Sequence, residues 1–204
     1  MGTRLLYLAR HGESAAAAQG SKPEDGELTA LGRQQADLLG RRLRGIPFSA
    51  IHHSPWRRAV QTAEAVAEHL PGVPLHPSAL LQECVPVVPD RERLTPGQAG
   101  FFDRLSSEQL AAGPAQAAAA LQAYAGPVAE DRRELIIGHG NLINWFVARA
   151  LDAPDHAWLR MLDYNCALTV IMYSPDRTRL ISYNDLGHLP PSMRGTDYPG
   201  EARI

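Results

Sequence analysis

Residues 3–14 read TRLLYLARHGES, a short apolar run that ends in an Arg-His-Gly triplet. The run has the length and the β-capable residues of a buried strand. Residues 134–140 read ELIIGHG and repeat the pattern of an apolar run, a histidine and a glycine. We therefore expect His11 and His139 to follow the carboxyl ends of two strands. In an open parallel sheet, these ends form the ligand site.

The rest of the chain alternates between helical and strand patterns, which predicts an α/β fold with a mostly parallel sheet. Ser54 followed by Pro55 is typical of a helix start, an N-cap before proline at the first helical position. We expect one domain over 1–195, a helical lid insertion over 85–125 and a loose C-terminal tail over 196–204. The expected helices are 29–44, 54–70, 97–112, 115–125 and 141–151, and the expected strands are 3–9, 48–53, 73–76, 134–137, 167–173 and 179–184.

Composition argues against several classes of protein. The net charge of −2, from 20 basic and 22 acidic residues, provides no basic field for nucleic acid or an anionic membrane. Two cysteines are too few for a disulfide framework or a cysteine-rich zinc site. The apolar run at 5–9 is too short for a secretory leader, and Gly-Pro interrupts the uncharged stretch 109–129 twice. We expect a soluble cytoplasmic protein with no nucleic-acid or membrane partner.

Several common phosphate-handling motifs are missing from the sequence. There is no Gly-x4-Gly-Lys-[Ser/Thr] loop, and Lys22 is the only lysine. Neither Cys84 nor Cys166 has an arginine six residues later, which argues against a cysteine-nucleophile phosphatase. An Asp-x-Asp pair and a Gly-x-Ser-x-Gly elbow are also missing.

A set of histidines and arginines remains, and it suits phosphoryl transfer. A neutral imidazole is a competent nucleophile toward phosphorus. If His11 and His139 share a pocket with Arg10 and Arg58, the guanidinium groups can bind the phosphoryl oxygens without a metal. A partly buried carboxylic acid must then protonate the leaving oxygen.

These residues stand in a recognisable order. Arg10-His11-Gly12-Glu13 resembles the signature of the histidine phosphatase superfamily, the phosphoglycerate-mutase-like proteins. Other matches follow in the family's order and extend over nearly the whole chain. They are Leu28-Thr29 with Gly32, Ser54-Pro55 with Arg58, Leu81-Gln82-Glu83, Ile137-Gly138-His139-Gly140, Asn165, and the stretch 184–189.

The resemblance implies a three-layer α/β/α sandwich and a phosphomonoesterase that needs no metal and no cofactor. His11 would carry the phosphoryl group, Glu83 would act as general acid and then as general base, and His139 would be the second catalytic histidine. The phosphate-binding residues would be Arg10, His11, Arg58 and His139, and the pocket rim would include Ser14, Gln19, Gly140 and His188. The substrate would be a phosphorylated small molecule or a phosphoprotein, and a homodimer is left open.

The chain departs from the family pattern at two places. Ala17 stands where the family often has asparagine, so a phosphate contact is lost or is replaced by Gln19. Cys84-Val85-Pro86 stands where mutases carry a His-Tyr-Gly-like segment, which favours hydrolysis over a phosphoglycerate-type mutase. A phospho-ligand-binding protein with an inactive pocket is a further alternative. Protein dephosphorylation is another, because 80–89 and 149–160 resemble the branch that contains mitochondrial protein serine/threonine phosphatases.

Overall fold

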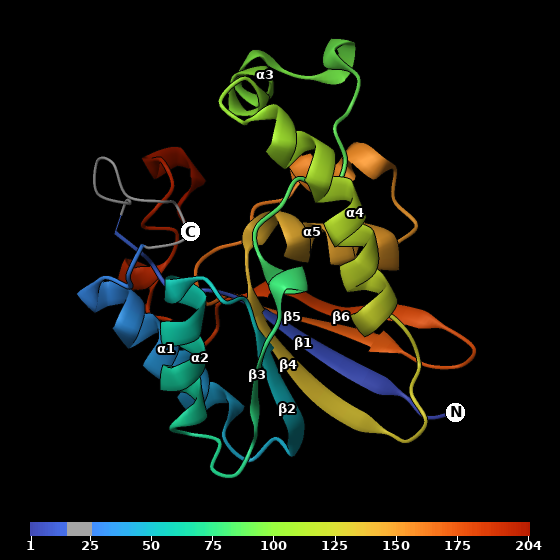
Figure 1. Ribbon diagram of the computed structural model, residues 1–204. Helices are drawn as coiled ribbons and strands as arrows, with labels where there is room; N and C mark the ends of the chain where they lie inside the picture. Colours follow the sequence, from blue (N-terminus) through green and yellow to red (C-terminus); the bar gives the residue numbers. More distant parts are fainter. Residues whose placement is uncertain (16–25) are drawn as a thin grey trace.

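The computed structural model describes residues 1–15 and 26–204, so the predictions about Ala17 and Gln19 concern positions outside the described residues. The described part contains a six-stranded sheet with strand order β3-β2-β4-β1-β5-β6 (Figure 1). The strands are β1 Arg4–Arg10, β2 Phe48–His53, β3 Leu75–Pro77, β4 Arg132–Gly138, β5 Leu168–Tyr173 and β6 Thr178–Asp185. The α-helices are α1 Ala30–Leu43, α2 Arg57–Ala67, α3 Pro96–Phe102, α4 Ser107–Tyr124 and α5 Gly140–Ala150.

Strand pairing confirms a mostly parallel sheet. β1 pairs in parallel with β4, β4 with β2, and β2 with β3, whereas β5 runs antiparallel to its neighbours β1 and β6. In the β1–β4 register, Ala9 lies opposite Ile137 and Arg10 opposite Gly138. The next residue of each chain segment is a histidine. The register therefore sets the two histidines next to each other at one edge of the sheet.

Helices cover both faces of this sheet, which confirms the three-layer α/β/α sandwich (Figure 1). Side chains alternate along the strands, so Leu6, Leu8 and Ile136 pack in one core cluster with α4 and α5. Leu135 and Ile137 point to the opposite face and pack in a second cluster with α1 and α2. The residues that the structure describes include no helix both long enough and apolar enough to cross a bilayer.

The predicted helix break at Gly113-Pro114 is wrong. α4 runs unbroken through Pro114, and the break lies between α3 and α4 instead. Ser106 starts α4 with a capping box, in which its hydroxyl accepts from the Gln109 amide at 3.2 Å and the Gln109 side chain accepts from the Ser106 amide at 2.9 Å. Gly113 is needed for packing, because a Cβ there would lie 2.3 Å from the Val85 carbonyl oxygen.

The C-terminal residues differ from the predicted loose tail. The Tyr164 hydroxyl donates to the Ala202 carbonyl, and the Tyr164 and Tyr198 rings meet edge to face at 5.2 Å. Arg203 Nε donates to the Tyr198 carbonyl at 2.9 Å. These contacts hold the segment against Tyr164, because aromatic packing and hydrogen bonds to backbone carbonyls outweigh its loop-like composition.

Candidate active site

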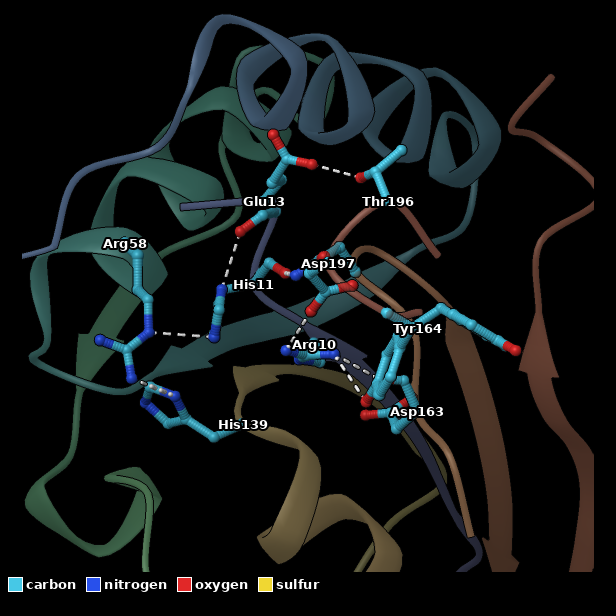
Figure 2. Close-up of polar contacts among 12 residues, drawn as sticks. Arg10, His11, Glu13, Arg58, His139, Asp163, Tyr164, Thr196 and Asp197 are labelled. Carbon is cyan, nitrogen blue, oxygen red and sulfur yellow. Dashed lines mark hydrogen bonds and ion pairs between the residues drawn. The ribbon is translucent and has the colours of Figure 1, made fainter. Parts of the chain in front are cut away.

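Two buried histidines form the centre of the site. His11 is 6% exposed and His139 is 0% exposed, and their ring centroids lie 5.1 Å apart (Figure 2). The amide of His11 donates to the Gly138 carbonyl at 3.0 Å, which extends the β1–β4 ladder to the first histidine. The structure thus brings together the two residues that the sequence places 128 positions apart.

Hydrogen bonds determine which ring nitrogen of each histidine carries the proton. His11 Nδ1 lies 2.8 Å from the Gly12 carbonyl oxygen and must donate to it, which leaves Nε2 as an acceptor for Arg58 Nε at 3.0 Å. His139 Nδ1 accepts from Arg58 Nη2 at 3.2 Å, and its Nε2 donates to the Ser54 hydroxyl at 2.9 Å. Each imidazole is therefore neutral, and the lone pair of His11 Nε2 faces the arginine.

The surroundings keep both imidazoles neutral. Burial lowers the pKa of His11 well below its ordinary value, and the nearby charges of Arg10 and Arg58 lower it further. The pKa of His139 is lowered well below its ordinary value by burial and then by His11 and Arg58. At neutral pH, His11 consequently has an unprotonated nitrogen available for nucleophilic attack.

Arg58 reaches both histidines from the first turn of α2. Its guanidinium lies 4.6 Å from the centroid of the Trp56 ring, and the same ring meets His139 at 4.8 Å. The Thr62 hydroxyl donates to the Arg58 carbonyl at 2.7 Å and accepts from the Gly12 amide at 3.1 Å. This hydroxyl links α2 to the loop that carries His11.

The start of α2 corrects the prediction of an N-cap at Ser54. The N-cap is Trp56, and no side chain caps the helix there. The Ser54 hydroxyl lies 3.3 Å from the Trp56 amide, from which it accepts a hydrogen bond, and it also accepts from His139. Ser54 is therefore a hydrogen-bond partner of His139 and not the N-cap of α2, and the helix begins later than a Ser-Pro pair would indicate.

Arg10 is held by the C-terminal segment. Its Nη1 donates to the Asp163 carbonyl at 2.6 Å, and its Nη2 pairs with the Asp197 carboxylate at 2.7 Å (Figure 2). Nη1 also donates to the Tyr198 hydroxyl at 3.1 Å. Burial opposes the charge of Arg10, but Asp197 and the other acidic neighbours outweigh it and raise the guanidinium pKa. Arg10 is thus a charged group that already faces a carboxylate.

Glu83 lies near Arg10 and Arg58 and follows the 3₁₀ turn Ala79–Leu81 by two residues. Burial raises the pKa of its carboxyl to about 7, although Arg10 and Arg58 act in the opposite direction. Its Oε1 is buried with no hydrogen-bond partner among the residues described. A carboxyl group with this pKa is partly protonated at neutral pH and suits proton donation.

Sequence reasoning missed one buried acid. Asp163 is 1% exposed, and neither of its carboxylate oxygens has a hydrogen-bond partner within the described part of the chain. Burial raises its pKa to about 8. No spacing marks this residue in the sequence.

The predicted rim residues have different environments. A Cβ on Gly140 would lie 3.8 Å from the Arg10 Cδ, so this glycine lies against the guanidinium stem. Ser14 forms an isolated bridge with Leu28. His188 Nε2 donates to the Cys166 carbonyl at 3.0 Å, and the Cys166 amide donates to the Arg10 carbonyl. The contact of His188 is therefore to the segment that supports Arg10, and not to the two histidines.

The loop around His11 is supported by Asn165, which the sequence analysis names, and by Gln35, which it does not. The Asn165 side chain donates to the His11 carbonyl at 2.9 Å, and the Gln35 side chain accepts from the Glu13 amide at 2.8 Å. The Glu13 carboxylate accepts from the hydroxyls of Thr29 and Thr196. Over residues 1–15 and 26–204, no three or more histidine, cysteine, aspartate or glutamate side chains are grouped as a metal site.

Comparison with known proteins points to one family. A family model described as the histidine phosphatase superfamily, branch 1, matches residues 6–186. The chain is 36% identical over 203 residues to the mitochondrial serine/threonine-protein phosphatase Pgam5 of Caenorhabditis briggsae, covering 93% of this chain and 66% of that protein. It is 35% identical over 198 residues to the human mitochondrial serine/threonine-protein phosphatase PGAM5, covering 93% of this chain and 65% of that protein.

Solved structures agree with the sequence relatives. YhfR of Bacillus stearothermophilus superposes with a TM-score of 0.69 at 26% identity, covering 92% of this chain and all of the other. A phosphoglycerate mutase from Plasmodium falciparum has a TM-score of 0.62 at 27% identity, covering 93% of this chain and 96% of the other.

The comparisons contradict the predicted cytoplasmic location. The curated relatives, of which this chain spans 65–66% of the length, are named as mitochondrial proteins. The prediction used the short apolar run at 5–9, whose length bears on secretion and does not report on import into an organelle.

Proposed function

The chain belongs to branch 1 of the histidine phosphatase superfamily, and from this membership we propose a metal-independent phosphomonoesterase that works through a phosphohistidine on His11. Membership supports the expected enzyme class, a phosphoric monoester hydrolase. The observation that carries the mechanism is the neutral Nε2 of His11, which accepts from Arg58 Nε at 3.0 Å in a buried site.

Each step of the reaction has a residue to perform it. In the first step, His11 Nε2 forms a bond to phosphorus, the bond from phosphorus to the ester oxygen breaks, and Glu83 gives its proton to the leaving oxygen. In the second step, Glu83 takes a proton from water, the resulting hydroxide bonds to phosphorus, and the nitrogen–phosphorus bond breaks. Inorganic phosphate leaves, and the enzyme returns to its starting protonation state.

Side chains of the site can stabilise the negative charge of the transferred phosphoryl group. Arg10 and Arg58 supply guanidinium donors, and His139 lies against Arg58 with an Nδ1 that can take up a proton when a phosphoryl dianion arrives. Preorganised donors of this kind stabilise the equatorial oxygens of a phosphoryl group. We therefore propose that divalent metal is not required.

Trapping the covalent intermediate tests this proposal. We expect rapid acid-free quenching during hydrolysis of a ³²P-labelled monoester, in buffer with EDTA, to yield a protein-bound phosphate that is stable to base and labile to acid. Peptide mapping should assign it to the peptide that contains His11. Full turnover without any such adduct, or turnover that is abolished by EDTA, would overturn the proposal.

A phosphoprotein is a candidate substrate beside a phosphorylated small molecule. The relatives named as PGAM5 serine/threonine-protein phosphatases favour it. A phosphoglycerate-type mutase is less well supported despite the structural likeness to a phosphoglycerate mutase, because Cys84-Val85-Pro86 follows Glu83 in place of a His-Tyr-Gly-like segment.

The ion pair between Arg10 and Asp197 leads to a prediction about phosphate affinity. Because Asp197 compensates the charge of Arg10, its carboxylate competes with a bound phosphate for the same guanidinium. We expect Asp197→Asn to tighten the binding of inorganic phosphate about fivefold, or ~1 kcal/mol, measured by titration calorimetry. Asp176→Asn is the matched control, since Asp176 pairs with the exposed Arg177. Weaker binding in Asp197→Asn would mean that Asp197 mainly holds Arg10 in position.

A further inference from the structure

A cavity of about 440 Å³ lies beside Glu83, between the segment 83–85 and the helices α3 and α4. Its size falls within the range of about 300–1,000 Å³ that is typical of small-molecule sites. This volume is more than a phosphate group fills. The proposed catalytic steps do not use the remaining volume, which is therefore available to another part of a bound ligand.

The walls of the cavity are mostly apolar. The apolar side chains that line it are those of Trp56, Val85, Phe101, Leu105 and Ala112. Gln109, Gln116 and Asn141 add neutral polar groups, and Glu83 and Glu108 are its acidic members. No arginine, lysine or histidine is among the described residues that line it. A carboxylate or a second phosphate placed here would lose its hydration and gain no cationic partner.

Trp56 and Glu83 connect the cavity to the phosphoryl site. The Trp56 ring lies against His139 at 4.8 Å and under the Arg58 guanidinium at 4.6 Å, so one of its sides belongs to the phosphate-binding group. Trp56 and Glu83 also line the cavity. An ester whose phosphoryl group lies on His11 therefore has its leaving oxygen near Glu83 and the rest of its alcohol in the cavity.

Packing between α4 and the Glu83 segment maintains the cavity. The Gln116 side chain donates to the Gln82 carbonyl at 2.8 Å and to the Leu80 carbonyl at 3.3 Å. Asn141 donates to the Cys84 carbonyl at 3.3 Å, and Gly113 lets α4 approach Val85 closely. The cavity wall is thus held to the same backbone that positions the proposed acid.

We propose that this cavity binds the leaving group of the substrate and selects an uncharged alcohol with a flat apolar face, such as an aryl alcohol, over an anionic one. The inference rests on the proposed function, because it assumes that the phosphoryl group occupies the His11 site. Aromatic side chains at Trp56 and Phe101 match a flat ring, and the absence of cations among the described lining residues disfavours acidic alcohols.

Matched substrates test the selectivity. 2-Naphthyl phosphate and 4-carboxyphenyl phosphate release phenols of similar acidity, so the chemical step treats them alike. We expect kcat/KM for the naphthyl ester to exceed that for the carboxyphenyl ester by about tenfold or more, because the carboxylate is left unpaired in the cavity. Equal values, or a preference for a phosphoserine peptide over the naphthyl ester, would overturn the inference.

A rim variant and a binding measurement complete the test. Ala112→Arg adds a cation at the exposed rim and should reduce the preference at least fivefold, whereas Ala118→Arg, on an exposed part of α4 outside the cavity lining, should leave it unchanged. Titration calorimetry with 2-naphthylmethylphosphonate and 4-carboxybenzylphosphonate should show the same order of affinity, and the reverse order would overturn the inference. These analogues cannot be hydrolysed. Selective binding without any turnover of esters would therefore refute the phosphatase proposal and keep the cavity inference.

Discussion

Replacing His11 with asparagine is expected to lower kcat/KM for 4-nitrophenyl phosphate by at least about 10³-fold, the scale of loss when a nucleophile is removed. The amide nitrogen of asparagine can reproduce the Nδ1 donor that bonds the Gly12 carbonyl at 2.8 Å, but it offers no atom in place of Nε2. The substitution therefore removes the nucleophile and preserves the local hydrogen bond. His11→Ala should lose as much activity.

Folding and metal controls make the result for His11 specific. Far-ultraviolet circular dichroism and the melting temperature of His11→Asn should remain close to those of the wild type. His76→Asn is a matched control, because His76 is an exposed histidine on β3 at the sheet edge. EDTA should leave the wild-type rate unchanged. Turnover in His11→Asn within about tenfold of wild type would refute a nucleophilic role for this residue.

Replacing Glu83 with glutamine is expected to have an effect that depends on the leaving group. For 2-phenylethyl phosphate, whose alkoxide needs a proton to depart, kcat/KM should fall about 10²–10⁴-fold. For 4-nitrophenyl phosphate, whose phenolate leaves without a proton, kcat/KM should fall less than about tenfold. Glu108→Gln is the matched control, since Glu108 lines the same cavity from an exposed position on α4. Equal losses for the two esters would exclude Glu83 as the general acid.

The raised pKa of Glu83 also predicts the pH profile. A general acid must be protonated, and burial raises the pKa of Glu83 from 4.5 to about 7. For 2-phenylethyl phosphate, kcat/KM should thus hold below pH 7 and fall about tenfold per pH unit above it. The alkaline decline should be missing from Glu83→Gln and present in Glu108→Gln. A wild-type profile that still rises above pH 8 would contradict this role.

Local sequence patterns were sufficient for the framework of the fold. Apolar runs of strand length before His11 and His139 predicted β1 and β4, and the helical patterns over 29–44 and 141–151 predicted α1 and α5. Such signals lie within a few neighbouring residues, so they can be read without knowing which segments meet. The Gly113-Pro114 pair misled the prediction because packing against Val85 favours a continuous helix at a position where local propensity favours a break.

The residues that bear the chemistry, and their order along the chain, can be read directly from the primary structure, since the histidine, arginine and glutamate motifs are short and contiguous. The partners of those residues follow from the three-dimensional fold. Ser54 hydrogen-bonds His139, Asp197 pairs with Arg10 across 187 positions, and the buried Asp163 lies beside the same guanidinium. Burial, hydrogen-bond geometry and pKa depend on distances between segments remote in the chain, which arise from strand register and helix packing and leave no local pattern in the sequence.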